Sequence, residues 1–208
     1  MTAKIKLNAA SGGGSFSLQA PSSSSNNRVF TIPDVADGTI LTTTNPKAGN
    51  IIQVKQTLKT DTFSATIAGN ATEFSGDCIT LDFQCSSTSN KILIMANLSY
   101  NHSQSQRTGI VLFAGGSEVA AATGDAAGSR DRISTADRYQ YTNVTGTLTH
   151  TFLHSPSSTS NITYSYRFLN LDSSNADDTI YLNRTSSDTD AAYIGRPTSS
   201  ITIMEIAA

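Results

Sequence analysis

The sequence is poor in the residues that usually carry chemistry: among 208 residues there is no tryptophan, and there are only two cysteines and three histidines. Charged residues make up 14% of the chain, against about 25% in an average globular protein. The formal net charge of −2 comes without the basic patch or stripe that nucleic-acid-binding proteins carry. The charge therefore predicts no nucleic-acid partner. No run of about 18 apolar residues occurs, so the sequence predicts no membrane span.

The start of the chain, MTAKIKL, lacks the apolar core of a secretory signal. We therefore expect the protein to be made and assembled in a cytoplasm. The several Asn-x-Ser/Thr triplets are expected by chance in a chain this rich in serine and threonine.

The two cysteines, Cys78 and Cys85, flank a strand-like alternation of apolar and polar residues. Seven steps along one strand would place them on opposite faces and roughly 23 Å apart, at about 3.3 Å per residue. A disulfide requires Cα atoms within about 7 Å. We therefore predict two free thiols, at least one of them in the core. Neither a CxxC pair nor a Cys/His cluster is present, which argues against zinc.

The sequence lacks the residue sets that would support catalysis or a metal site. It has no G-x-S-x-G elbow and no phosphate-cradling glycine loop. Glycan cleavage would need paired carboxylates beside aromatic platforms, yet the chain has only three glutamates, Glu73, Glu118 and Glu205. His150 and His154 would share one face of a strand about 13 Å apart, too far for one metal ion. We predict no enzyme, no metal and no cofactor.

The composition that remains is rich in serine and threonine, and apolar residues recur in short alternating runs. Disorder is one interpretation of low hydrophobicity, but the alternation is typical of β-strands with a hydroxyl-covered surface. No convincing helix is present. We predict an all-β chain whose main part is a jelly-roll-like antiparallel β-sandwich. The strands are expected at residues 51–58, 62–67, 78–84, 91–99, 109–114, 117–122, 143–153, 162–171, 178–183 and 200–206.

The chain is expected to have two parts, a segment of residues 1–47 and a head of residues 48–208. The first part has brief apolar pairs separated by turn residues, a hairpin rhythm. A sheet with so few apolar side chains buries too little surface to offset its chain entropy, so we expect it to mediate oligomerisation and attachment. The residues predicted to do so are Ile5, Leu7, Phe16, Leu18, Phe30 and Ile32.

One long polar stretch, residues 124–141, stands out within the predicted head. Long loops in compact domains are often functional, and arginine and tyrosine are enriched in recognition surfaces. The alternative is a packed loop in which arginines pair with Asp125, Asp131 and Asp137. The predicted receptor- or interface-contact residues are Arg130, Arg132, Arg138, Tyr139 and Tyr141.

Three stretches at the N-terminus form a recognisable series: KIKLNAASGGGSFSLQAP (4–21), RVFTIPD (28–34) and GTIL (38–41). The head continues it with GNIIQV (49–54), TDTFS (60–64), SNKILI (89–94), GDAAGSR (124–130), YLNR (181–184) and SITIMEI (200–206). In this order the stretches resemble fibre-type structural proteins of the virions of marine and cyanobacterial tailed phages, which implies assembly in the cytoplasm of a host bacterium. The resemblance implies a homotrimer that attaches to other tail or capsid proteins through its N-terminal segment. The head would point outward, and the chain has no long shaft, coiled coil or collagen-like repeat.

Three functions follow as hypotheses. The first is a short tail-fibre subunit on the virion surface that recognises and attaches to a host surface glycan or protein. The second is a capsid decoration or head-fibre protein that stabilises the capsid. The third is a carbohydrate-binding, lectin-like module.

Overall fold

The computed structural model describes residues 4–19, 22–23, 25, 46–69, 73–104, 107–138, 141–171 and 177–208. The chain divides into two compact units, residues 1–40 and 41–208. In the part of the chain that is described, no helix has the length and hydrophobicity needed to cross a membrane. Each unit is described by itself below.

In the N-terminal unit, strands β1 (Lys4–Asn8) and β2 (Ser15–Gln19) form an antiparallel hairpin. Its turn contains Gly12 and Gly13 at φ of 83° and 72°, a left-handed backbone that favours glycine. The register places Ile5 opposite Leu18 and Leu7 opposite Phe16. Ile5, Leu7 and Leu18 therefore share one face of the hairpin. Ile5, Leu7 and Leu18 are 64%, 59% and 50% exposed. An isolated two-stranded hairpin is marginally stable, so this apolar face needs a partner. Phe30 and Ile32 lie outside the described residues.

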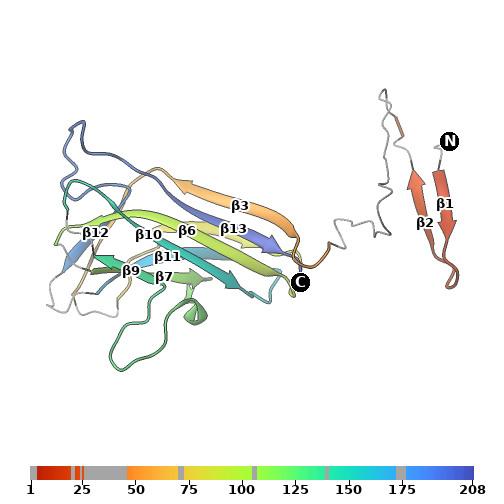
Figure 1. Ribbon diagram of the computed structural model, residues 1–208, viewed down its shortest axis with the longest axis horizontal. Coiled ribbons are helices and arrows are strands. Elements are labelled where there is room, and N and C mark those ends of the chain that lie inside the picture. The colour runs from red at the N-terminus through yellow and green to blue at the C-terminus, as the bar shows by residue number, and fades with distance from the viewer. Residues whose placement is uncertain are drawn as a thin grey trace, which may run out of the picture. The chain divides into compact units, whose positions relative to one another are not determined.

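The larger unit consists of two antiparallel sheets (Figure 1). The first sheet contains β3 (Ile51–Lys59), β4 (Phe63–Ile67), β6 (Lys91–His102), β10 (Gly146–His154), β12 (Asp178–Leu182) and β13 (Ser199–Ile206). The second sheet contains β5 (Ile79–Gln84), β7 (Arg107–Ala114), β8 (Ser117–Glu118), β9 (Thr135–Arg138) and β11 (Asn161–Asn170). A single turn of 3₁₀-helix, η1 (Ala120–Ala122), follows β8.

The register shows that several of these strands are halves of one interrupted strand. β12 and β13 lie along the same edge of β6, with Ile180 opposite His102 and Ser200 opposite Asn97. β3 pairs with β13 and β4 pairs with β12, so β3 and β4 form a second interrupted strand. β8 and β9 both pair with β7 and form a third. Each sheet is therefore four strands wide. In chain order the sheets read first–eighth–third–sixth and second–seventh–fourth–fifth, which is jelly-roll topology and confirms the predicted fold class.

The core lies between the two sheets and follows from the alternation along each strand. In β5 the burial alternates residue by residue, with Ile79, Leu81 and Phe83 inward. In β13, Ile201 and Ile203 are fully buried, and the alternating residues Thr202 and Met204 point outward. Burying each such aliphatic or aromatic side chain contributes about 1.5–3 kcal/mol.

The cysteines depart from the prediction in one respect. Cys78 and Cys85 are both free and both buried, rather than on opposite faces of one strand. Each lies just outside β5, where the alternation of the strand no longer fixes the direction of its side chain. Burial raises the pKa of the Cys78 thiol to about 12, so this thiol is protonated at neutral pH.

Two predictions around residue 120, one of a strand and one of a loop, were wrong. The predicted strand 117–122 ends after Glu118, because the chain turns into η1 at Ala120. The stretch 124–141 is not loop throughout, since β9 pairs residues 135–138 with β7. Its sequence, TADR, has no apolar alternation, and only the exposed edge of β7 makes it a strand.

Candidate functional site

The loop between β8 and β9 is held by hydrogen bonds to its own backbone. Arg132 donates from Nε to the Gly124 carbonyl (2.7 Å) and from Nη2 to the Ala120 carbonyl (2.9 Å). The Gly124 amide donates to the Ile133 carbonyl at 3.2 Å. A turn at Gly128, with φ of 65°, lets the Arg130 amide reach the Ala127 carbonyl at 3.3 Å. The loop therefore has a defined shape despite its polar sequence.

Beside this loop lies an open cavity of about 420 Å³. Its apolar lining includes Phe74, Ala120 and Leu169, and Phe74 and Leu169 form an isolated β-bridge. The Phe74 ring also packs edge-on against Phe113, with 5.1 Å between ring centroids. The polar lining comes from Glu118 and from the loop residues Arg130, Asp131 and Arg132.

The cavity offers hydrogen-bond donors and acceptors above an apolar floor, with two guanidinium groups balanced by two carboxylates. A guanidinium has five N–H donors, and the loop carbonyls take two of those of Arg132. The remaining donors and the two carboxylates suit a ligand with many hydroxyl groups, which both donates and accepts hydrogen bonds. The Phe74 ring suits the C–H surface of such a ligand. A sugar has both properties.

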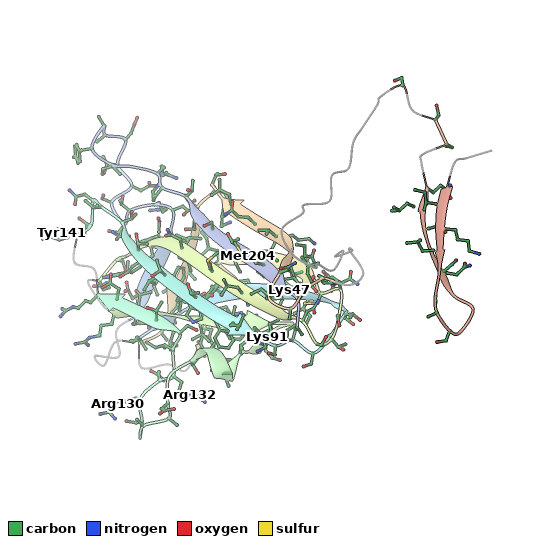
Figure 2. All side chains as sticks on the ribbon, turned by 45° about the vertical axis from the view of Figure 1, so that its right-hand side comes forward. Lys47, Lys91, Arg130, Arg132, Tyr141 and Met204 are labelled. Atoms are coloured by element: carbon green, nitrogen blue, oxygen red, sulfur yellow. The ribbon has the colours of Figure 1, made fainter. Side chains whose placement is uncertain are left out.

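The structure brings together only some of the predicted contact residues. Arg130 and Arg132 line the same cavity, whereas Tyr141 lies elsewhere on the domain and is 67% exposed (Figure 2). Arg138 is on β9, in register with Arg107. Tyr139 lies outside the described residues. The predicted loop thus supplies one cavity and a separate exposed tyrosine, not one surface.

The alternative interpretation of the loop, pairs between its arginines and aspartates, fails for two of them. Within the described residues, Arg130 and Arg132 form no ion pair with Asp125, Asp131 or Asp137. Their hydrogen bonds go to backbone carbonyls instead. Sequence reasoning missed Phe74 and Leu169, because only the sheet pairing brings these distant positions to the loop. It also missed Glu118, which lies on β8 directly before the loop.

The histidines occupy structural positions. His150 Nδ1 and the Tyr166 hydroxyl are 2.8 Å apart, and His154 packs edge-on against Tyr164 at 5.9 Å. As predicted, both histidines lie on the same face of one strand, which is the inner face of β10. Burial lowers the pKa of each below 6.5. His102 lies 3.7 Å from buried Asp178. No group of three or more metal-ligating side chains occurs among the described residues.

Comparison with known proteins gives only distant likenesses. No family model matches the chain, and no curated protein matches it. Among solved structures, T=1 particles derived from infectious bursal virus match with a TM-score of 0.42 and 8% identity, over 92% of this chain and 45% of the other. A subviral particle of infectious bursal disease virus VP2 matches with a TM-score of 0.36 and 10% identity, over 94% and 48%. The chain thus spans less than half the length of these structures, and a likeness at this level carries no functional information.

Proposed function

We propose that this protein is a virion structural protein: a short, homotrimeric tail-fibre subunit whose head attaches to a host surface glycan. The N-terminal hairpin unit mediates oligomerisation and docking to other virion proteins. The jelly-roll unit carries the surface that meets the host. The proposal includes no catalytic step.

The observation that carries the proposal is the contrast between a hairpin without a core and a complete sandwich in one chain. Ile5, Leu7 and Leu18 are at least half exposed on one face of the hairpin, and exposed apolar surface of this kind is stabilised by association. The resemblance of residues 4–41 and of the head to phage fibre proteins supports the same division of roles.

The candidate host contact is the cavity beside the β8–β9 loop. Its hydroxyl-compatible lining over Phe74 favours a glycan above a protein epitope, and its volume of about 420 Å³ fits a small sugar unit. Arg130 is its most suitable probe, since its described hydrogen bond is a single contact to the Ala127 carbonyl at 3.2 Å. Arg132 would be a poor probe because it also holds the loop.

The test is a glycan array with the purified full-length protein, repeated with Arg130→Ala. We expect binding to a defined set of host glycans and an about tenfold weaker affinity for the variant, as the loss of one charged hydrogen bond predicts. Arg196→Ala, an exposed arginine on the loop between β12 and β13, is the matched control and should leave affinity unchanged.

Localisation on the particle by electron cryo-microscopy tests the other half of the proposal. Density at the tail supports a fibre. Density on the capsid together with a silent array would favour the decoration protein instead, and glycan binding by a protein absent from virions would favour the lectin-like module.

A further inference from the structure

The outer face of the first sheet carries a continuous row of apolar side chains. The register aligns Val54 of β3 with Met204 of β13, Met204 with Leu93 of β6, and Leu93 with Leu153 of β10. These four residues cross all four strands of the sheet at one level. The next level towards the start of β6 pairs Ile51 with Ile206 and Ile206 with Lys91. Met204 and Lys91 are labelled in Figure 2.

This row is exposed in the single chain, most of all on the two edge strands. Val54 is 53% exposed, Ile51 58% and Leu153 48%. The next level on the other side of the row is uncharged, and three of its four residues are polar: Gln56, Thr202 and Thr151 lie in register with Met95. In the row itself and in the levels beside it from Ile51 to Leu58, Lys91 is the one charged side chain. Depletion of charge around an apolar centre distinguishes protein interfaces from ordinary surface.

The free edge of the sheet, by contrast, is guarded against strand pairing. Lys55 of β3 points towards the second sheet, with its Nζ 5.8 Å from the centre of the Phe83 ring and 3.5 Å from the Asp82 carbonyl. Inward-pointing charges on an edge strand are a common defence against edge-to-edge association. A partner is therefore expected on the face of the sheet and not on the β3 edge.

We propose that this face is covered by neighbouring copies of the same chain, with three first sheets facing a common threefold axis. The inference rests on the proposed homotrimer and assigns its interface in the head. An uncharged, hydroxyl-flanked apolar row is compatible with a copy of itself, because no like charges meet at its centre. Across the row and the levels beside it, a partner with a strongly charged surface would find only Lys91 to pair with.

The size of the face explains why three tethered copies are expected rather than a free dimer. Four strands about 4.8 Å apart give the face a width of roughly 19 Å. The four levels from Ile51 to Leu58 span roughly 27 Å, so the flat footprint is on the order of 500 Å². A stable interface buries about 800 Å² per partner. The face is thus an interface core that needs a second contact, and association through the hairpins would supply it by raising the local concentration of heads.

Thiol labelling of the full-length protein tests the proposal. Cys78 and Cys85 are buried, so they contribute little background. Val54→Cys places a thiol at a position 53% exposed in the single chain, and Thr80→Cys places one at an exposed, outward position of β5 in the second sheet. We expect Val54→Cys to react at least about tenfold more slowly than Thr80→Cys, with the mass measured in parallel by analytical ultracentrifugation. Leu153→Cys repeats the measurement from the opposite edge strand.

The outcomes separate this inference from the function on which it rests. A three-copy mass with a protected Val54→Cys thiol supports both. A three-copy mass with equal labelling rates overturns the interface and leaves the trimer. A protected thiol with a two-copy mass overturns the threefold arrangement, and a monomer with equal rates overturns both the interface and the trimer.

Discussion

The two outer faces of the sandwich are built from the same kind of alternating strands but differ in what covers them. On the second sheet, Arg167 lies over the Phe113 ring at 4.1 Å and bonds to Asp77 at 2.6 Å. The residue after Phe74, Ser75, bonds to the backbone of Phe168. On the first sheet, Val54 and Leu153 are about half exposed. One face is covered by side chains of the chain itself, and the other leaves an apolar row about half exposed.

The largest change in the free energy of unfolding is expected for a substitution of Glu205, which lies on the inner side of β13 next to the exposed row. Glu205 is fully buried and accepts hydrogen bonds from Gln53, from Asn90, and from both the amide and the hydroxyl of Ser86. Glu205→Ala should lower the free energy of unfolding by about 3 kcal/mol, because it leaves buried donors unpaired. Urea denaturation measures this. The adjacent outward residue provides the control: Met204→Ala should cost clearly less, and equal losses would contradict the contrast between the two sides of β13.

A substitution on the covered face of the second sheet should lower the free energy of unfolding by a smaller amount. Arg167→Ala removes the cation–π contact with Phe113 and the bond to Asp77, both of them partly exposed to solvent. We expect a decrease of about 1–2 kcal/mol in the free energy of unfolding by denaturant titration. Arg196→Ala removes an exposed ion pair with Asp188 and should change stability by less than about 0.5 kcal/mol. If the two variants lost the same amount, Arg167 would not be part of a structural cover.

Two histidines on the inner face of β10 are expected to make stability depend on pH. Burial lowers the pKa of His150 and His154 below 6.5 in the folded state, so the unfolded chain binds more protons as pH falls. Stability should therefore decrease from about pH 7 down to the folded pKa values. Thermal unfolding of His150→Gln and His154→Gln across this range should show a weaker decrease than the native sequence, and an unchanged slope would exclude these histidines as its source.

A second pH window lies lower and belongs to Glu205. Burial alone would raise the pKa of this carboxyl, but hydrogen bonds from Asn90, Gln53 and Ser86 outweigh burial and hold the pKa below 4.5. The stability that this group contributes is therefore present above about pH 4.5 and is lost as pH falls through the folded pKa. Glu205→Gln should flatten the stability curve between about pH 5 and pH 3. The same slope in the variant would contradict this assignment.

The smallest effect is expected on the exposed row. Val54→Thr keeps the β-branched shape at a position 53% exposed, so unfolding of the single chain should change by less than about 0.5 kcal/mol. A loss above about 1 kcal/mol at protein concentrations where the chain is monomeric would mean that this face is already packed within the chain.

Much of the head could be predicted from sequence because it follows from local alternation. ITLDFQ in β5 and SSITIMEI in β13 alternate without interruption, so the predicted strands 78–84 and 200–206 match the observed ones to within one residue. β9 could not be predicted, since TADR has no pattern of its own and pairs only because β7 offers a free edge. The same holds for the cavity: Arg130, Asp131 and Arg132 were in the predicted loop, whereas Phe74 and Leu169 reach it through sheet pairing.

The sequence by itself determined that this is an all-β chain with a thin N-terminal hairpin and a sandwich head, because the period of two along a strand is a local property. Only the tertiary structure decided which apolar residues remain outside. Val54, Leu93, Leu153 and Met204 are far apart in the chain and unremarkable singly, and the register of four strands aligns them into one row. Register depends on pairing between distant segments, so no local pattern could reveal it.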